Sequence, residues 1–383
     1  MDAMGQRFRI EPLSLATALR RPDITPNPIY VGVPLTHHRK EFAIDIWEDW
    51  VLVIIRWMAF PGGALSRCFL RNWRTGTGVD VCHNNQPHFL PINASREQCD
   101  GFELLYARFL DSSTILAVRN AQESLGDIVR CKFDSNTGRL SVSHVFQPPQ
   151  AHGPVEIMTI STPRVSWKVT DEATEDVLCP LFRPRSHGGV VAFSLGMRAT
   201  WPGPLPYTLI VQATTFLNAS ELFPATPFST TADLVEVAWE EWGPTQSRLL
   251  NGGRLPTIHS AGLQPHGHRY PLLVNVASGT PSSLRILDFN PIPCTHQGIT
   301  DDAKRSDKHF CVSDPQTIYD PIVWGGAITT GLPYCYGEIK GDFGTVKDVI
   351  MDSEKLVLTK VCVHKDLQQA CIHCIYRNAE LGS

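Results

Sequence analysis

The chain lacks the residue runs that would place it in several functional classes. Only 19% of its 383 residues are charged, below the usual quarter, and no cluster of Lys and Arg stands out. We therefore expect no binding of nucleic acid through a broad basic surface. The most apolar run, from Trp50 to Phe60, contains Arg56 and is far shorter than the roughly 20 residues that cross a bilayer. The sequence predicts no membrane span.

Targeting signals and regular cysteine spacing are missing as well. The first 19 residues hold no apolar stretch of secretory length, because three charged side chains interrupt them. The 11 cysteines are odd in number and irregularly spaced. We interpret them as reduced thiols of a cytoplasmic or nuclear protein. On the same ground we expect the two glycosylation sequons, at Asn93 and Asn218, to stay unmodified.

Motifs for nucleotide chemistry and hydrolysis are also absent. No phosphate-binding P-loop occurs, and Gly76 with Gly78 lacks the third glycine and the following helix of a dinucleotide-binding fold. The segment 192–196 lacks the first glycine of a serine-hydrolase elbow. We therefore expect no catalytic residues and no cofactor.

The C-terminal region holds five residues of metal-ligand type: Cys362, His364, Cys371, His373 and Cys374. A zinc site here would require a turn that brings them together. We interpret 371–376 as a strand, in which side chains alternate and Cys371 and Cys374 point to opposite faces. The prediction is ordinary strand thiols and no metal.

What the sequence does contain is a repeated pattern of short strands, clearest over residues 102–146. Four runs rich in β-branched and aromatic residues alternate with turns rich in Asp, Asn, Ser and Gly. The predicted strands are 102–109, 114–118, 128–133 and 140–146. A sheet of about 40 to 45 residues is typical of one propeller blade. Both faces carry apolar side chains, so neighbouring sheets must cover them.

The same turn sequence occurs twice. The segment NWRTG at 72–76 matches DSNTG at 134–138, and both end in Thr-Gly after an apolar strand. Further pairs of runs recur, such as 190–197 with 207–216 and 270–277 with 284–289, while helical periodicity is almost absent. A sandwich rarely needs so many strand pairs in one domain.

These patterns predict an all-β fold. We expect a β-propeller of about five to seven four-stranded blades over residues 41–377. An irregular, extended arm at 1–40 precedes it, because four prolines interrupt most of that segment. A short tail at 378–383 follows.

Four residues are candidates for a binding face. Trp201, Trp242, Arg248 and Arg269 flank predicted turns, and Trp and Arg side chains dominate binding energy at protein interfaces. Most other tryptophans fall within predicted strands, where we expect them to pack in the core.

Several stretches resemble the C-terminal region of fungal F-box proteins of the mushroom-forming group. They are EFAIDIWEDWVLVI (41–54), NWRTG (72–76), ARFLDSSTIL (107–116), WEEWGP (239–244), LPY (332–334) and IMDSEKL (350–356). The resemblance covers roughly residues 41–362. It implies a WD-repeat-like propeller that receives protein substrates for ubiquitination, in proteins whose N-terminal F-box binds a small adaptor of the ubiquitin ligase.

Residues 1–40 depart from that family, because they show no Leu-Pro-x-Glu start and no room for three helices. The expected partner is therefore a protein of unknown identity and not the ligase adaptor. The alternative is a propeller enzyme of glycoside-hydrolase type, which needs paired carboxylates at the propeller axis. The adjacent pair Glu240 and Glu241 would face opposite ways in a strand. We therefore favour a non-catalytic protein-interaction domain.

Overall fold

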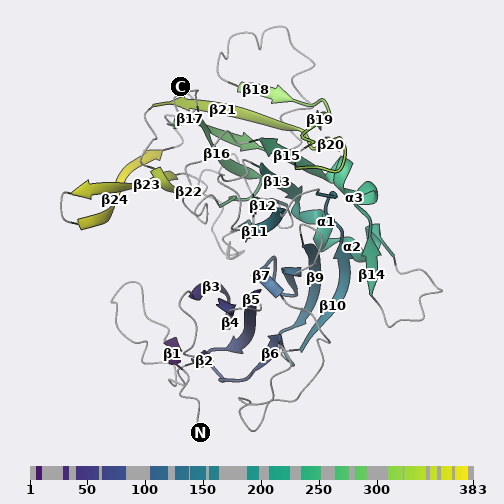
Figure 1. Ribbon diagram of the computed structural model, residues 1–383, viewed down its shortest axis with the longest axis vertical. Coiled ribbons are helices and arrows are strands. Elements are labelled where there is room, and N and C mark those ends of the chain that lie inside the picture. The colour runs from purple at the N-terminus through teal and green to yellow at the C-terminus, as the bar shows by residue number, and fades with distance from the viewer. Residues whose placement is uncertain are drawn as a thin grey trace, which may run out of the picture. The chain divides into compact units, whose positions relative to one another are not determined.

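A computed structural model of the chain consists mainly of antiparallel strands (Figure 1). It describes residues 6–10, 29–33, 40–59, 63–82, 104–119, 126–137, 139–151, 155–163, 188–197, 207–224, 234–251, 264–275, 281–290, 309–321, 323–341, 346–351, 355–364 and 367–377. The helices in these ranges are short and the strands many, which confirms the predicted all-β class.

The chain forms two compact units. Unit 1 comprises Met1–Gln122, Gly126–Phe146 and Ala225–Glu236. Unit 2 comprises Glu123–Leu125, Gln147–Pro224 and Val237–Ser383. The division runs through the region 41–377, which was predicted to be one domain.

Unit 1 contains two blade-sized antiparallel sheets and a small ladder. The ladder pairs β1 (Gln6–Ile10) with β2 (Ile29–Val33). A four-stranded sheet has the order β3 (Lys40–Trp47), β4 (Trp50–Ala59), β5 (Gly63–Asn72), β6 (Gly78–Cys82). A five-stranded sheet has the order β14 (Val235–Val237), β10 (Arg139–Phe146), β9 (Asp127–Asp134), β8 (Thr114–Arg119), β7 (Leu104–Phe109).

The four strands predicted over 102–146 are confirmed as β7 to β10, each pairing with the next. The inner strand β8 is buried from Thr114 to Val118 without alternation. Such continuous burial is expected when both faces of a sheet are covered. Leu70, Ile115 and Val129 belong to the apolar core of unit 1.

The N-terminal arm was predicted to lack regular structure, and this is wrong for the β1–β2 ladder. Pro28 directly precedes β2 and Pro34 directly follows it. Proline disrupts a ladder from within but is tolerated at its ends, so these residues limit the strand without preventing it.

The two copies of the turn motif share their local chemistry. The Asn72 side-chain oxygen accepts hydrogen bonds from the backbone N–H groups of Arg74 and Thr75, at 3.0 and 3.1 Å. Gly76 has a φ of 73°. In the second copy, Asp134 accepts a hydrogen bond from the Asn136 N–H at 2.9 Å. Asx-type turns of this kind need no distant contact, which is why the sequence reveals them.

Unit 2 contains the remaining sheets and the helices. One sheet has the order β11 (Val155–Ser161), β12 (Val190–Met197), β13 (Tyr207–Gln212), β15 (Ser247–Asn251). A second has the order β16 (Arg269–Asn275), β17 (Pro281–Asp288), β21 (Tyr334–Lys340), β18 (His309–Val312). Two smaller sheets are β19 (Gln316–Ile318) with β20 (Ile328–Thr330), and β22 (Val346–Met351), β23 (Lys355–His364), β24 (Leu367–Arg377). The helices are α1 (Ala213–Leu217), α2 (Ala219–Leu222) and α3 (Trp239–Gln246).

Both strand pairs predicted for this part of the chain are confirmed, as β12 with β13 and β16 with β17. The sheet of β16 departs from chain order, because β18 pairs with the outer side of β21 and not with β17. Figure 1 shows β21 as a long strand with β18 beside it. Tyr270, Leu284 and Phe289 lie in the apolar core of unit 2.

The segment at 239–246 differs from its prediction. We expected Glu240 and Glu241 to lie in a strand and Trp242 to flank a turn, but the residues form α3. Glu240 and Glu241 are exposed in its first turn, where negative charge interacts favourably with the helix dipole. The argument that these two glutamates alternate across a strand is therefore wrong.

Candidate functional site

The sequence-predicted contact residue Trp242 lies in the interior of unit 2. Its ring has no exposed area and packs 5.0 Å from Trp239 and 6.2 Å from Phe216, measured between ring centroids. Its indole N–H donates to the Gln147 carbonyl at 3.1 Å. The expected exposure beside a turn is wrong, because α3 directs this side chain inward.

Arg248, the second predicted contact residue, is buried in β15. Its guanidinium donates two hydrogen bonds of 3.1 Å to the Asp314 carbonyl and one of 3.2 Å to the Thr330 carbonyl. Its Cζ atom lies 5.2 Å from the centre of the Tyr334 ring. Burial lowers the pKa of Arg248. The side chain therefore fixes the backbone before β19, at Asp314, and at the end of β20, at Thr330, and does not face a partner.

The other two predicted residues have different outcomes. Arg269 begins β16 and stays partly exposed, with its Nε atom 3.4 Å from a carboxylate oxygen of Asp288. Trp201 lies outside the described residues. The structure does not gather the predicted set on one face, since two of its members are interior. A binding role for Arg269 and Trp201 stays a prediction.

A different group of side chains forms a partly exposed surface in unit 2. Strand alternation places Tyr336 and Glu338 of β21 on the same face. The ladder sets Phe310 of β18 opposite Tyr336, and Arg285 of β17 opposite Glu338. We call these four residues the Phe310 patch. They come from three adjacent strands of one sheet.

Stacked rings and an ion pair hold the Phe310 patch together. The Phe310 and Tyr336 rings stack with centroids 5.1 Å apart and planes 24° apart. The Arg285 Cζ atom lies 4.9 Å from the centre of the Tyr336 ring, and its Nε atom lies 3.2 Å from a Glu338 carboxylate oxygen. Cation–π contacts and ion pairs at such distances orient the side chains that make them.

The charges of the Phe310 patch are set by its neighbours. A hydrogen bond from Ser283, assisted by Arg285, lowers the pKa of Glu338, so this carboxylate is ionised at neutral pH. Tyr334 adjoins the patch, with its ring centroid 6.3 Å from that of Tyr336. Burial raises the pKa of the Tyr334 phenol. The patch thus combines a balanced pair of charges with aromatic surface.

Phe310 is the exposed member, with 53% of its surface accessible. A large apolar side chain that is both exposed and held in a stack differs from the scattered exposed apolar residues found on any surface. Sequence reasoning missed it because β18 is only four residues long and pairs with a strand from a later part of the chain. The alternation Tyr334-x-Tyr336-x-Glu338 was the available signal.

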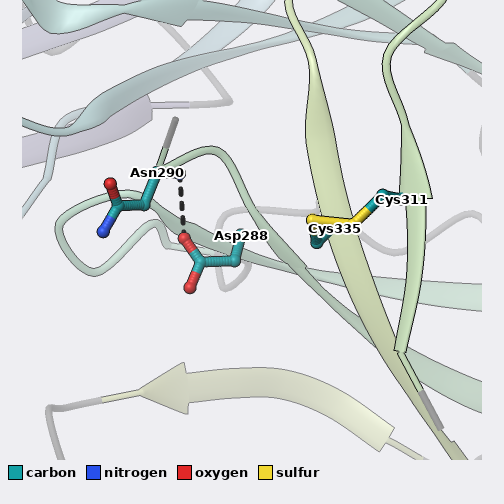
Figure 2. Close-up of a disulfide and its surroundings, with 4 residues drawn as sticks. All are labelled: Asp288, Asn290, Cys311 and Cys335. Carbon is teal, nitrogen blue, oxygen red and sulfur yellow. Dashed lines mark hydrogen bonds between the residues drawn. A yellow bond between two sulfur atoms is a disulfide. The ribbon is translucent and has the colours of Figure 1, made fainter. Parts of the chain in front are cut away.

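The opposite face of this sheet carries a disulfide between Cys311 and Cys335, which are direct partners on β18 and β21 (Figure 2). The prediction of reduced thiols is wrong for this pair. Asp288 is the partner of Cys335 on β17, and its carboxylate accepts a hydrogen bond of 2.9 Å from the Asn290 N–H. Cys68 and Cys131 are buried cysteines that form no disulfide.

No metal centre is found among the described residues, where no three His, Cys, Asp or Glu side chains converge. The predicted tail residues lie on β23 and β24, and the structure does not describe the side chains of these five residues. Their ladder shifts register between Leu358 and Thr359, opposite residues 372–374. A register shift interrupts regular alternation, which was the basis for separating Cys371 from Cys374. The absence of zinc stays a prediction.

Comparison with known proteins adds no relative: no protein-family model matches the chain, and no curated protein matches it. In the described parts of the chain, none of the helices has the length and apolar character needed to span a membrane.

Proposed function

We propose that the protein is a non-catalytic protein-interaction domain whose contact surface is the Phe310 patch. The observation that carries this proposal is the exposed Phe310 ring, held in a stack on Tyr336. The partner is a protein segment that packs an apolar side chain against this ring.

The composition of the patch supports a role in binding. Aromatic residues and Arg are enriched where protein interfaces bury surface, and a few such residues carry most of the binding energy. Arg285 and Glu338 already satisfy each other, so a partner need not neutralise an isolated charge. A side chain that is ordered before binding loses little conformational entropy when the complex forms.

The propeller architecture and the ligase link belong to the same proposal. The strands β3 to β6, and β7 to β10, form antiparallel sheets in chain order, as propeller blades do. We propose about five to seven such blades. The resemblance to F-box proteins makes the partner a candidate for ubiquitination. We expect no micromolar binding of the ligase adaptor in calorimetry, and a measurable heat of binding would contradict that part.

The patch is tested with two exposed aromatic residues of unit 2. Partners are captured from a lysate of the parent cell, identified by mass spectrometry and purified. Their affinity is then measured for the wild type, for Phe310→Ala and for Tyr319→Ala, because Tyr319 is 73% exposed and lies outside the patch. Truncation of an interface hot spot costs about 2 kcal/mol, which is roughly 30-fold in affinity.

The expected result is a loss of this size for Phe310→Ala and unchanged binding for Tyr319→Ala. Arg285→Ala should weaken binding as well, because the guanidinium orients the Tyr336 ring. If each purified partner binds Phe310→Ala as tightly as the wild type, the patch is not the contact surface. Circular dichroism confirms that each variant is folded before binding is measured.

A further inference from the structure

We propose that the Cys311–Cys335 bond is a site of reversible thiol–disulfide exchange with dithiol reductants. The bond joins directly opposite residues of an edge strand and its neighbour, with Cα atoms 4.1 Å apart. A separation this short is typical of the non-hydrogen-bonded positions of an antiparallel ladder.

The two sulfur atoms differ in access. Cys311 is exposed on β18, whereas Cys335 is buried on β21. Exchange begins with the attack of a thiolate on an accessible sulfur, and exposed disulfides are the ones that take part in regulation or exchange. Cys311 is therefore the point of attack, and Cys335 is the leaving group.

The exchange balances as a two-electron reduction. One thiolate of the dithiol bonds to Cys311 Sγ, the bond between the cysteines breaks, and Cys335 leaves as a thiolate that takes up a proton. The second thiolate of the dithiol then attacks the dithiol sulfur that is bonded to Cys311. Cys311 is released and takes up a proton. The protein gains two electrons and two protons, and the dithiol becomes a disulfide.

Reduction has a local consequence, because the disulfide joins a short edge strand to its neighbour. Among the described residues, this four-residue strand pairs with β21 alone within its sheet, and Phe310 stacks on Tyr336. The chain that follows is held independently, since Arg248 bonds the carbonyl groups of Asp314 and Thr330. We expect reduction to free β18 and leave β20 in place.

The first test is chemical. Protein purified without reductant is exposed to dithiothreitol, quenched with iodoacetamide in native buffer, and mapped by mass spectrometry. The expected result is alkylation of Cys311 and Cys335 only after dithiothreitol, and no alkylation when oxidised dithiothreitol re-forms the bond before iodoacetamide is added. Cys68 and Cys131 are buried internal controls and should stay unlabelled. Labelling of the pair before reduction, or only together with Cys68 and Cys131, would overturn the proposal.

The second test is hydrogen exchange of the same samples. Amides of β18 should exchange about tenfold faster after reduction, because local opening becomes easier, and amides of β20 should change less than about twofold. The double variant Cys311→Ser with Cys335→Ser should match reduced wild type with or without dithiothreitol. Equal exchange of β18 in oxidised and reduced protein would show that the bond does not hold the strand.

Exchange also connects to binding, and this step alone rests on the proposed function. A freed β18 carries Phe310 away from Tyr336. Dithiothreitol should therefore weaken the affinity of a partner for the Phe310 patch about tenfold in the wild type and leave it unchanged in the double variant. Alkylation and hydrogen exchange need no partner, so failure of the exchange site is distinguishable from failure of the binding surface.

Discussion

Tyr270 shows how burial changes the acid–base behaviour of a single residue. The side chain lies in the core of unit 2, and burial raises its pKa to about 12 against the effect of a hydrogen bond with Thr208. An unfolded chain gives up this proton near pH 10. Between about pH 10 and 12 the unfolded state therefore holds fewer protons than the folded state, and stability falls as the pH rises.

Tyr270→Phe should remove this dependence. We expect its free energy of unfolding to fall less steeply than that of the wild type, by about 1.4 kcal/mol per pH unit between pH 10 and 12. Urea unfolding at pH 9, 10 and 11 measures the two slopes. Tyr319→Phe, at an exposed position, is the matched control variant. If the free energy of unfolding of Tyr270→Phe has the same slope against pH as that of the wild type, the raised pKa of Tyr270 is contradicted.

Trp242 is the residue whose predicted role changed most. Trp242→Ala should lower the free energy of unfolding by about 3 to 5 kcal/mol, because it leaves a cavity beside Trp239 and Phe216. Trp242→Phe should cost less, since it keeps an aromatic ring, although it loses the hydrogen bond to Gln147 and part of the ring volume. Chemical denaturation measures both. A Trp242→Ala protein of normal stability with impaired partner binding would restore the surface role.

At the scale of elements, the disulfide closes a chain segment that contains β19 and β20. Cys311 and Cys335 are 24 residues apart in sequence. Closing a loop of this length restricts the unfolded chain and contributes about 3 kcal/mol. We expect reduced protein to lose stability by this amount in urea unfolding. The double variant Cys311→Ser with Cys335→Ser should show no difference between oxidising and reducing buffer, and equal wild-type curves in the two buffers would refute the expectation.

At the scale of the molecule, each of the two units has its own core. Leu70 in unit 1 and Leu284 in unit 2 have no exposed area. We expect two unfolding transitions, with Leu70→Ala shifting one and Leu284→Ala shifting the other, each by about 2 to 5 kcal/mol. Tryptophan fluorescence and circular dichroism in guanidinium follow them. A single transition that both variants shift, seen equally by both probes, would show that the units unfold together.

The sequence by itself determined the strands and turns that depend on neighbours a few residues away. The four strands at 102–146 and the turns at Asn72 and Asp134 follow from β-branched residues and from side chains that bond their own backbone. The pairing of β12 with β13 and of β16 with β17 joins strands that follow each other in the chain. These features need little information from distant parts of the chain.

Only the tertiary structure decided which distant segments meet. The position of β18 beside β21 joins Phe310 to Tyr336 and Cys311 to Cys335, and it depends on which edge of the sheet is open. The interior position of Trp242 depends on α3 forming where a strand and turn were expected. Local preference is weak there, so burial of the tryptophan rings selects the helix, and burial is a property of the assembled core.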